Sequence, residues 1–346
     1  MLALSFAPSA GKFSVLWDIP MIPKYQAEAG WSGASVWGSQ PSIDTNRGQV
    51  FIATGNTYSI PAVIIDCQTA TQNVTAVVEG LVPDPCLPRD IWQESVLAID
   101  IELGIVNWVN QLPALDAWTL ACGLSPFLPR NPVTCPETPG PDADFGMAPT
   151  FVPGSPSTPY GKDTLVVGQK NGNLYAISAQ SGELFWATAT SPGGGFGGLS
   201  WGIAVDDSRI YFTAINSREE AWQLDPSGQT VTRSAYGAAS LLNGSLLWET
   251  GTPLNGVAYG PPTVVGDVVL VARTGFDPNQ TLTYDSTNGS LIALRKATGN
   301  ILTTIGLSSN FHGGIAVQGQ AIMFGTGYSP STPEPPSAFE VMRVVG

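Results

Sequence analysis

Two short patterns alternate along the whole chain of 346 residues, and they constrain the fold more than any other feature. The first pattern, A-x5-G-x3-W, occurs at 95–108, 173–186 and 237–248, without its final tryptophan at 290–303, and in a looser copy that ends at Trp17. Each copy places β-branched and aromatic residues on both sides of a glycine that can take a positive φ. Such a segment is typical of a β-hairpin, so five hairpins are expected.

The second pattern is an aromatic residue followed by glycine and then by two short strands. It begins at Trp37, Phe145, Trp201, Tyr259 and His312, so the only histidine of the chain takes a position that holds Trp, Phe or Tyr elsewhere. Together the two patterns make five units of four strands, and one such unit cannot bury both of its faces alone. The sequence therefore predicts an all-β fold, a five-bladed β-propeller of four-stranded antiparallel blades.

The two ends of the chain are expected to close this propeller, as one domain over residues 1–346. Strands near 313–325 would join the N-terminal strands near 2–17, which removes an open sheet edge. The C-terminal segment F-E-V-M-R-V-V competes for the third strand position of that blade. The alternative is a fragment of a larger propeller that lacks upstream blades.

Long loops are expected on one face of the propeller, because the turns of a four-stranded meander alternate between its two faces. The longest are 57–92, 112–145 and 216–236, whereas the turns within hairpins are short. Surface loops often carry function, so this face is expected to hold the functional site.

The four cysteines flank two of these long loops, which predicts the pairs Cys67–Cys86 and Cys122–Cys135. Each disulfide would close a loop of roughly ten to twenty residues and contribute about 3 kcal/mol. Four N-x-S/T sequons stand at Asn73, Asn243, Asn279 and Asn288. Disulfides and sequons together favour a secreted glycoprotein.

A net charge of −13 argues against two classes of partner. It repels nucleic acid and acidic membranes. No apolar run is long enough to cross a bilayer, and the first residues lack the basic start of a signal peptide. The expected partner is a small apolar or quinone-like molecule, and the sequence leaves the oligomeric state open.

A pocket for this molecule is predicted where the first strands of the blades converge. First strands are innermost in a propeller, so Trp37, Phe145, Trp201, Tyr259 and His312 would form an aromatic collar near the axis. Glycine after each ring would let the backbone approach closely. The alternative is that the five rings pack between blades and touch no ligand.

Six short segments between about residues 30 and 328 carry a resemblance to a known family. They are W-G-S-Q-P-S-I-D, F-I-A-T-G-N, L-D-A-W-T-L-A-C, D-A-D-F-G-M-A-P, V-V-G-Q-K-N-G and S-W-G-I-A-V-D. The chain resembles the quinoprotein dehydrogenase-like propellers, in particular their plant and fungal polyvinyl-alcohol-dehydrogenase-like branch. This resemblance implies that Asn56 ligates calcium beside pyrroloquinoline quinone, that Asp116 is the catalytic base and that Lys170 contacts the quinone. Trp118, in the same D-x-W segment, joins Asn56 among the expected substrate-binding residues.

Departures from the family's pattern argue against a working quinone site. Ser35 stands where the metal-binding glutamate of the family is expected, and calcium prefers carboxylate oxygens. The adjacent cysteine pair of several quinoprotein alcohol dehydrogenases is absent, and five blades would narrow the channel. We therefore expect no bound metal and no redox cofactor.

The function that the sequence favours is a cofactor-free cyclisation of a bulky unsaturated molecule. The chain looks compatible with fungal hetero-Diels-Alder cyclases of terpenoid and polyketide biosynthesis, whose pocket supplies proximity, orientation and exclusion of water. His312 would donate a hydrogen bond or shuttle a proton, with Lys170 or Tyr259 as alternative donors. One alternative function is an alcohol dehydrogenase that uses pyrroloquinoline quinone and calcium, with Asp116 as base. A second alternative is non-enzymatic binding of glycans or other ligands.

Overall fold

The structure is a computed structural model that describes residues 1–38, 40–71, 84–112, 114–123, 129–275, 289–327 and 337–344. The chain divides into two compact units. Unit 1 comprises Met1–Phe151 and Ile177–Leu184, and unit 2 comprises Val152–Ala176 and Phe185–Gly346. The single domain expected over residues 1–346 stays a prediction.

Strands dominate the fold. Those before residue 160 are β1 (Leu2–Ala7), β2 (Lys12–Asp18), β3 (Ser32–Gly33), β4 (Ser42–Asp44), β5 (Gln49–Ala53), β6 (Thr57–Ser59), β7 (Ser95–Asp100), β8 (Val106–Gln111) and β9 (Thr150–Val152). Those between residues 160 and 260 are β10 (Thr164–Gly168), β11 (Asn173–Ser178), β12 (Leu184–Ala189), β13 (Ala204–Val205), β14 (Arg209–Ile215), β15 (Trp222–Gln223), β16 (Thr230–Val231), β17 (Ser234–Ser240) and β18 (Leu246–Gly251). The remainder are β19 (Thr263–Val265), β20 (Val268–Arg273), β21 (Ser290–Arg295), β22 (Ile301–Gly306), β23 (Ile315–Gln318), β24 (Ala321–Thr326) and β25 (Ala338–Arg343).

Helices are few and short. The described residues form α1 (Lys24–Glu28) and α2 (Ala62–Thr71), with single 3-10 turns at Leu120–Cys122, Pro159–Gly161 and Pro253–Asn255. Among the described segments, none of the helices is long and apolar enough to cross a membrane.

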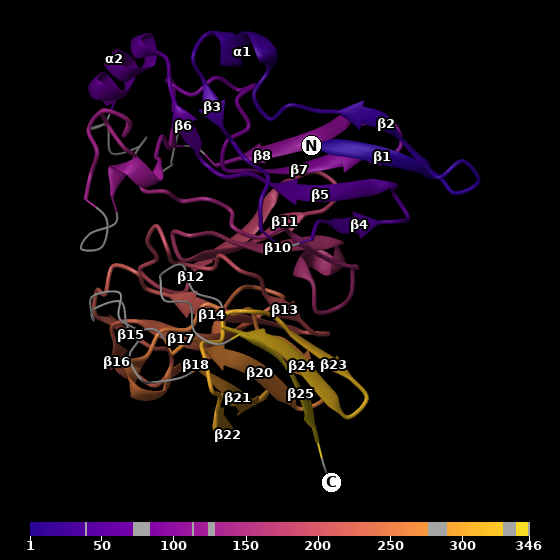
Figure 1. The fold of residues 1–346 in the computed structure, drawn as a ribbon, viewed down its shortest axis with the longest axis vertical. Coiled ribbons are helices and arrows are strands. Elements are labelled where there is room, and N and C mark those ends of the chain that lie inside the picture. Colours follow the sequence, from indigo (N-terminus) through magenta and orange to yellow (C-terminus); the bar gives the residue numbers. More distant parts are fainter. Residues whose placement is uncertain are drawn as a thin grey trace. The chain divides into compact units, whose positions relative to one another are not determined.

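Four sheets have four strands each (Figure 1). Their strand orders are β4-β5-β7-β8, β9-β10-β11-β12, β13-β14-β17-β18 and β19-β20-β21-β22. In each sheet the third and fourth strands come from an A-x5-G-x3-W segment, and the first and second strands follow an aromatic-glycine pair. The predicted all-β class, hairpins and strand pairs are confirmed.

The middle strands of these sheets are the most buried parts of the fold. Strands β5 and β10 are buried at every position, and β14 and β17 at every position but one. Their sequences are short continuous apolar runs such as Q-V-F-I-A and R-I-Y-F-T-A-I, which is the pattern of a strand covered on both faces. The sheets therefore bury both faces, as stacked sheets do.

In four of the hairpins, a tryptophan from the outer strand packs on the turn of the next hairpin along the chain. The indole nitrogens donate from Trp17 to Ile101 O (2.8 Å), from Trp108 to Ala179 O (3.2 Å), from Trp186 to Leu241 O (3.3 Å) and from Trp248 to Lys296 O (3.1 Å). The rings lie against the turn glycines, all of positive φ, where a Cβ would overlap the indole: Gly104, Gly182, Gly244 and Gly299. The recurrence of glycine and tryptophan in the first pattern thus reflects contact between successive hairpins.

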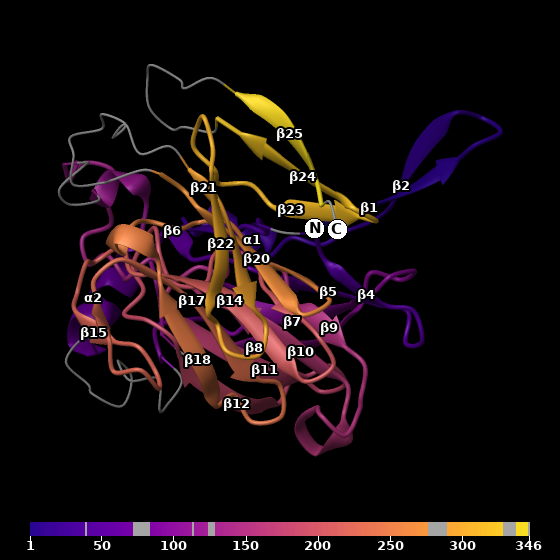
Figure 2. The same ribbon diagram turned by 90° about the horizontal axis from the view of Figure 1, so that it is seen from below.

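The two ends of the chain form smaller sheets. Strands β1 and β2 make a two-stranded sheet, and β23, β24 and β25 make a three-stranded one in which β25 lies beside β24 (Figure 2). The pairs from Ala321↔Arg343 to Thr326↔Ala338 fill this edge of β24. The C-terminal segment therefore takes the third position that was expected for the strands near 2–17. The number of blades and the closure of the ring stay predictions.

The long loops contain regular structure of their own. Segment 57–92 includes β6 and α2, and segment 216–236 includes the antiparallel pair β15–β16 and the start of β17. Both predicted disulfides are confirmed, with Cα atoms 5.7 Å apart in Cys67–Cys86 and 4.7 Å apart in Cys122–Cys135. Asn243 lies exposed in the β17–β18 turn, whereas the other three sequons, at Asn73, Asn279 and Asn288, fall outside the described residues.

Candidate active site

The five aromatic-glycine positions divide between the two units. Trp37 and Phe145 belong to unit 1, and Trp201, Tyr259 and His312 belong to unit 2. Phe145 is buried, with 1% of its surface exposed. The structure brings three of the five rings together in unit 2, and a collar of all five stays a prediction.

His312 contacts two rings in unit 2. Its ring centroid lies 4.9 Å from that of Trp201, edge to face, and 5.2 Å from that of Tyr259, nearly stacked. Burial lowers the pKa of His312 to about 4 and raises the pKa of Tyr259 to about 12. At neutral pH the imidazole is therefore uncharged, with one nitrogen that donates and one that accepts.

Asp116 lies in unit 1, in a segment that hydrogen-bonds with Thr57. The amide and the hydroxyl of Thr57 both donate to Asp116 O, at 2.9 and 2.7 Å. The Asp116 side chain is 1% exposed, and its Oδ2 accepts the Ala143 N–H at 2.7 Å. Within the described part of the chain, Oδ1 has no hydrogen-bond partner of regular geometry. The Asp116 carboxyl is thus buried next to Glu94, and a buried acid whose pKa is shifted by a second acid is a candidate for a functional role.

Three further acids that sequence reasoning missed are buried in unit 1: Glu94, Asp142 and Asp144. Burial, and then the charge of Asp116, raise the pKa of Glu94 well above its ordinary value. Burial also raises the pKa of Asp116, although Glu94 and the Ala143 N–H oppose this rise. Two neighbouring buried carboxyls cannot both ionise cheaply, so the pair retains a proton at a pH where exposed acids have lost theirs. The segment D-A-D-F-G and the Gln-Glu pair before β7 are the signals that could have revealed these acids.

Asn56 is fixed beside the same segment. Its Nδ2 donates to Thr57 O and to Trp118 O, both at 2.9 Å, and its backbone N–H donates to Asp144 Oδ1 at 2.6 Å. With Nδ2 engaged by two carbonyls, Oδ1 is the side-chain atom that can accept from or coordinate a ligand. The structure thus brings the segments of Asn56, Asp116 and Trp118 together, and the roles expected for these residues stay predictions.

Ser35 also lies next to this segment. Its carbonyl accepts the Gly55 N–H at 2.9 Å, and its hydroxyl accepts a hydrogen bond from Tyr58 OH at 3.0 Å. The position expected for a metal-binding glutamate therefore holds a neutral hydroxyl. Across the described ranges, no three His, Cys, Asp or Glu side chains converge as a metal site would require.

Lys170 is buried in unit 2, in the turn between β10 and β11. Its carbonyl accepts the Gly194 N–H at 3.0 Å. Gln169 Oε1 accepts from Asn171 Nδ2 at 2.5 Å and from Tyr175 OH at 2.9 Å, which fixes the turn. The contact of Lys170 with a quinone stays a prediction.

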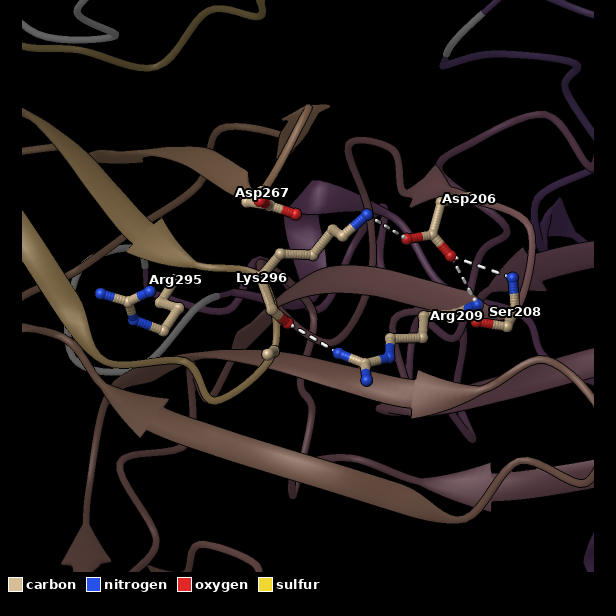
Figure 3. Close-up of a pocket in the computed structure, with 7 residues that line it drawn as sticks. Asp206, Ser208, Arg209, Asp267, Arg295 and Lys296 are labelled. Carbon is tan, nitrogen blue, oxygen red and sulfur yellow. Dashed lines mark hydrogen bonds and ion pairs between the residues drawn. The ribbon is translucent and has the colours of Figure 1, made fainter.

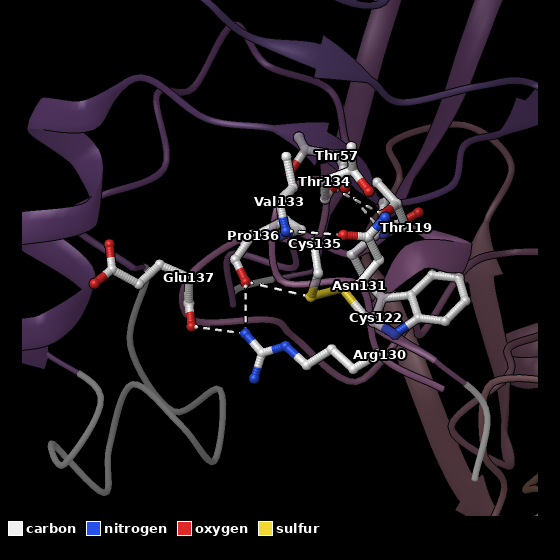
Figure 4. Close-up of a disulfide and its surroundings, with 12 residues drawn as sticks. Thr57, Thr119, Cys122, Arg130, Asn131, Val133, Thr134, Cys135, Pro136 and Glu137 are labelled. Carbon is white, nitrogen blue, oxygen red and sulfur yellow. Dashed lines mark hydrogen bonds between the residues drawn. A yellow bond between two sulfur atoms is a disulfide. The ribbon is translucent and has the colours of Figure 1, made fainter. Parts of the chain in front are cut away.

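The disulfide Cys122–Cys135 ties down the chain that follows Asp116 and Trp118 (Figure 4). The Asn131 N–H donates to Ala121 O at 2.7 Å, and Thr119 Oγ1 donates to Thr134 O at 3.3 Å. Figure 4 also shows the Arg130 guanidinium reaching the carbonyl oxygens of residues 136 and 137, at 3.3 and 3.4 Å. These bonds cross-link the loop at several points and limit its movement.

Unit 2 has a charged cavity of about 410 Å³ (Figure 3). It is lined by Asp206, Ser208, Arg209, Asp267, Arg295, Lys296 and Ala297. Lys296 Nζ lies 3.3 Å from Asp206 Oδ2, and Figure 3 shows Arg295 pointing away from this pair. Burial disfavours ionisation of Asp206, but hydrogen bonds from two backbone amides, Tyr211 and Lys296 outweigh it and lower its pKa. Three basic and two acidic side chains thus line this cavity.

A second cavity of unit 2, of about 330 Å³, is aromatic. It is lined by Pro159, Tyr160, Phe185, Trp186, Leu242 and Asn243. None of the residues proposed for catalysis from the sequence lines either cavity.

Two curated dehydrogenases are similar to part of the chain. A polyvinylalcohol dehydrogenase from Pseudomonas sp is 33% identical over 183 residues, which is 53% of this chain and 22% of that protein. A polyvinylalcohol dehydrogenase from Sphingopyxis sp. (strain 113P3) is 30% identical over 183 residues, which is 53% of this chain and 23% of that protein. The matched region thus covers less than a quarter of each relative.

Solved structures share the fold at low sequence identity. The quinohemoprotein alcohol dehydrogenase from Comamonas testosteroni superposes with a TM-score of 0.52 and 13% identity, over 85% of this chain and 45% of that one. A europium-containing methanol dehydrogenase gives a TM-score of 0.52 and 14% identity, over 86% and 51% of the two chains. These likenesses support a β-propeller fold.

The comparisons correct the expectation of a protein without a redox cofactor. The curated relatives are dehydrogenases, and one of the solved structures of the same fold is a quinohemoprotein. No cyclase is among these relatives, so the hetero-Diels-Alder hypothesis has no support from them. The PQQ_2 family model, described as outer membrane protein assembly factor BamB, matches residues 94–302, and the chain belongs to this family.

Proposed function

We propose that this chain contributes the proton-accepting part of the active site of a quinone-dependent alcohol dehydrogenase. The single observation that carries the proposal is Asp116, a buried carboxylate that is held by the Ala143 N–H and lies beside the buried Glu94. The similarity to polyvinylalcohol dehydrogenases supports it. Because the match covers less than a quarter of those proteins, the activity of this chain and its alcohol substrate remain part of the proposal.

The oxygen atoms near Asp116 fit a hard cation such as Ca²⁺. Asn56 offers Oδ1, because its Nδ2 donates to two carbonyls. Carboxylate and amide oxygens are the ligands that Ca²⁺ prefers. Since Ser35 supplies no carboxylate, the remaining ligands would come from the quinone and water. The quinone, when bound, would supply the oxidising power of the reaction.

Asp116 is suited to take the hydroxyl proton of an alcohol. The Ala143 N–H holds Oδ2, so Oδ1 is the oxygen that can accept the proton. Burial raises the pKa of Asp116, which makes the carboxylate a stronger base than an exposed aspartate. The disulfide-linked loop that follows Trp118 keeps this carboxylate in place. Activity should therefore fall as the pH drops through the raised pKa of Asp116.

The test compares Asp116→Asn with Asp44→Asn. Asp44 is also 1% exposed in unit 1, but it caps its own turn through the Asn46 N–H and pairs with Arg47. Each protein is incubated with pyrroloquinoline quinone and Ca²⁺, and dye reduction is followed with a secondary alcohol and with polyvinyl alcohol. General base catalysis contributes about 100-fold or more, so Asp116→Asn should lose at least that factor in kcat while Asp44→Asn keeps its activity. The absorption of bound quinone checks that Asp116→Asn still binds the cofactor.

Three results would reject the proposal. The first is a wild-type protein that neither binds the quinone nor reduces the dye. The second is an Asp116→Asn variant as active as the wild type. The third is an equal loss in Asp44→Asn, which would show that removal of any buried aspartate of unit 1 impairs the protein.

A further inference from the structure

Asn243 begins the sequon N-G-S in the exposed β17–β18 turn. Its Oδ1 accepts two hydrogen bonds from Ser245, from the backbone N–H at 3.1 Å and from the hydroxyl at 2.9 Å. A backbone N–H can only donate, so the atom that faces it must be the amide oxygen. Nδ2, the atom to which an N-linked sugar attaches, is therefore directed away from the turn.

This turn is held firmly by its own hydrogen bonds and by β12. The Gly244 N–H donates to Ser240 O at 2.8 Å, and Thr188 Oγ1 donates to Gly244 O at 2.9 Å. Trp186 packs against Gly244 and donates to Leu241 O at 3.3 Å. A group attached to Asn243 would thus start from a fixed point beside Trp186.

Asn243 lines the aromatic cavity of about 330 Å³. Tyr160 lies at its rim, 82% exposed and with a φ of 53°, which is strained for a residue other than glycine. The Tyr160 and Phe185 rings meet edge to face at 5.7 Å, and Lys162 Nζ lies 5.8 Å from each centroid. The exposed Tyr160 ring gains little from burial within this chain, so its arrangement beside the half-buried Phe185 points to a ligand that covers it.

A sugar ring has the chemistry that this cavity offers. Its C–H face is apolar and can cover an aromatic ring, while its hydroxyls can bond to the Lys162 ammonium or the Tyr160 hydroxyl. We propose that Asn243 carries an N-linked glycan whose first sugar rings cover Tyr160 and Phe185. The covalent link at the cavity edge makes the contact intramolecular, so even a weak contact is populated. This inference is independent of the function proposed for Asp116.

The experiment is a double-mutant cycle between Asn243→Gln and Tyr160→Ala. The four proteins are secreted from a eukaryotic host and also from a bacterial periplasm, which forms disulfides but does not glycosylate this sequon. Mass spectrometry of the peptide around residue 243 measures occupancy, with Ser245→Thr expected to keep the glycan and Ser245→Ala to lose it. Contacts on aromatic rings contribute about 1 kcal/mol, so Asn243→Gln should lower Tm by about 2 °C. In the Tyr160→Ala background the shift should disappear, and in the bacterial proteins no coupling should remain.

Leu254 provides a matched control. It is 85% exposed, has a φ of 61° and follows a proline in a 3-10 turn, as Tyr160 does, but it does not line the cavity. Leu254→Ala should leave the effect of Asn243→Gln unchanged. An unmodified Asn243 in a host that modifies another sequon of the chain would overturn the proposal. So would an equal Tm shift with and without Tyr160, because the glycan would then not touch the ring.

Discussion

Replacing Gly299 with alanine tests whether docking of tryptophan on hairpin turns holds successive hairpins together. Gly299 has a φ of 72°, and a Cβ there would lie 2.7 Å from Trp248 Cδ2 and 2.6 Å from Thr250 Oγ1. The left-handed conformation costs alanine about 1 kcal/mol. Displacing the indole also removes its bond to Lys296 O, and a buried N–H without a partner costs about 1–3 kcal/mol. Overpacking adds about 1 kcal/mol or more, so Gly299→Ala should lose about 3–5 kcal/mol.

Gly266→Ala separates the backbone cost from the docking cost. Gly266 also lies in a hairpin turn of unit 2 and has a φ of 55°, but nothing lies within 4 Å of a Cβ added there. This variant should lose only about 1 kcal/mol. Urea unfolding followed by circular dichroism gives both losses, and tryptophan fluorescence reports on the indole environment. If the two variants lost the same stability within about 0.5 kcal/mol, the reasoning would be refuted, because the cost of Gly299→Ala would then come from the backbone conformation alone and not from the indole.

Three further predictions concern titration and cross-linking. Burial raises the pKa of Glu249 to about 7, so its stabilising effect is complete below the unfolded pKa and is lost as the pH rises through 7. The free energy of unfolding of Glu249→Gln, measured in urea, should therefore rise relative to that of the wild type by up to about 3 kcal/mol between pH 5 and pH 8. Parallel pH profiles of the two proteins would contradict this. His312 is the only histidine, so its single Hε1 resonance should titrate near pH 4, whereas a midpoint near 6.5 would show that the ring is solvated. The double variant Cys122→Ser, Cys135→Ser should lower the free energy of unfolding of unit 1 by about 3 kcal/mol. An unchanged free energy of unfolding would show that hydrogen bonds alone hold the loop.

The sequence alone determined the local structure of this protein. The β-branched and aromatic residues on both sides of each turn glycine specified the hairpins, because strand pairing across a short turn involves neighbouring residues only. The disulfides followed for the same reason, since Cys122 and Cys135 are separated by 13 residues and flank one loop. The motif resemblance singled out Asn56 and Asp116, and the structure shows that their segments are in contact through Thr57 and Trp118.

Tertiary structure decided what depends on contacts between distant residues. The Asn56 N–H reaches Asp144 across 88 positions, and burial raises the pKa of Glu94 and of Asp116, yet no local pattern encodes the Asn56–Asp144 contact or the burial of these acids. The sequence also left open which strand pairs with the edge of β24, because β25 and the N-terminal strands are both apolar. The observed residue pairs between β24 and β25 decide it. Strand composition specifies that a residue enters a sheet, but long-range packing specifies its neighbour, because that choice depends on the free energy of the whole fold.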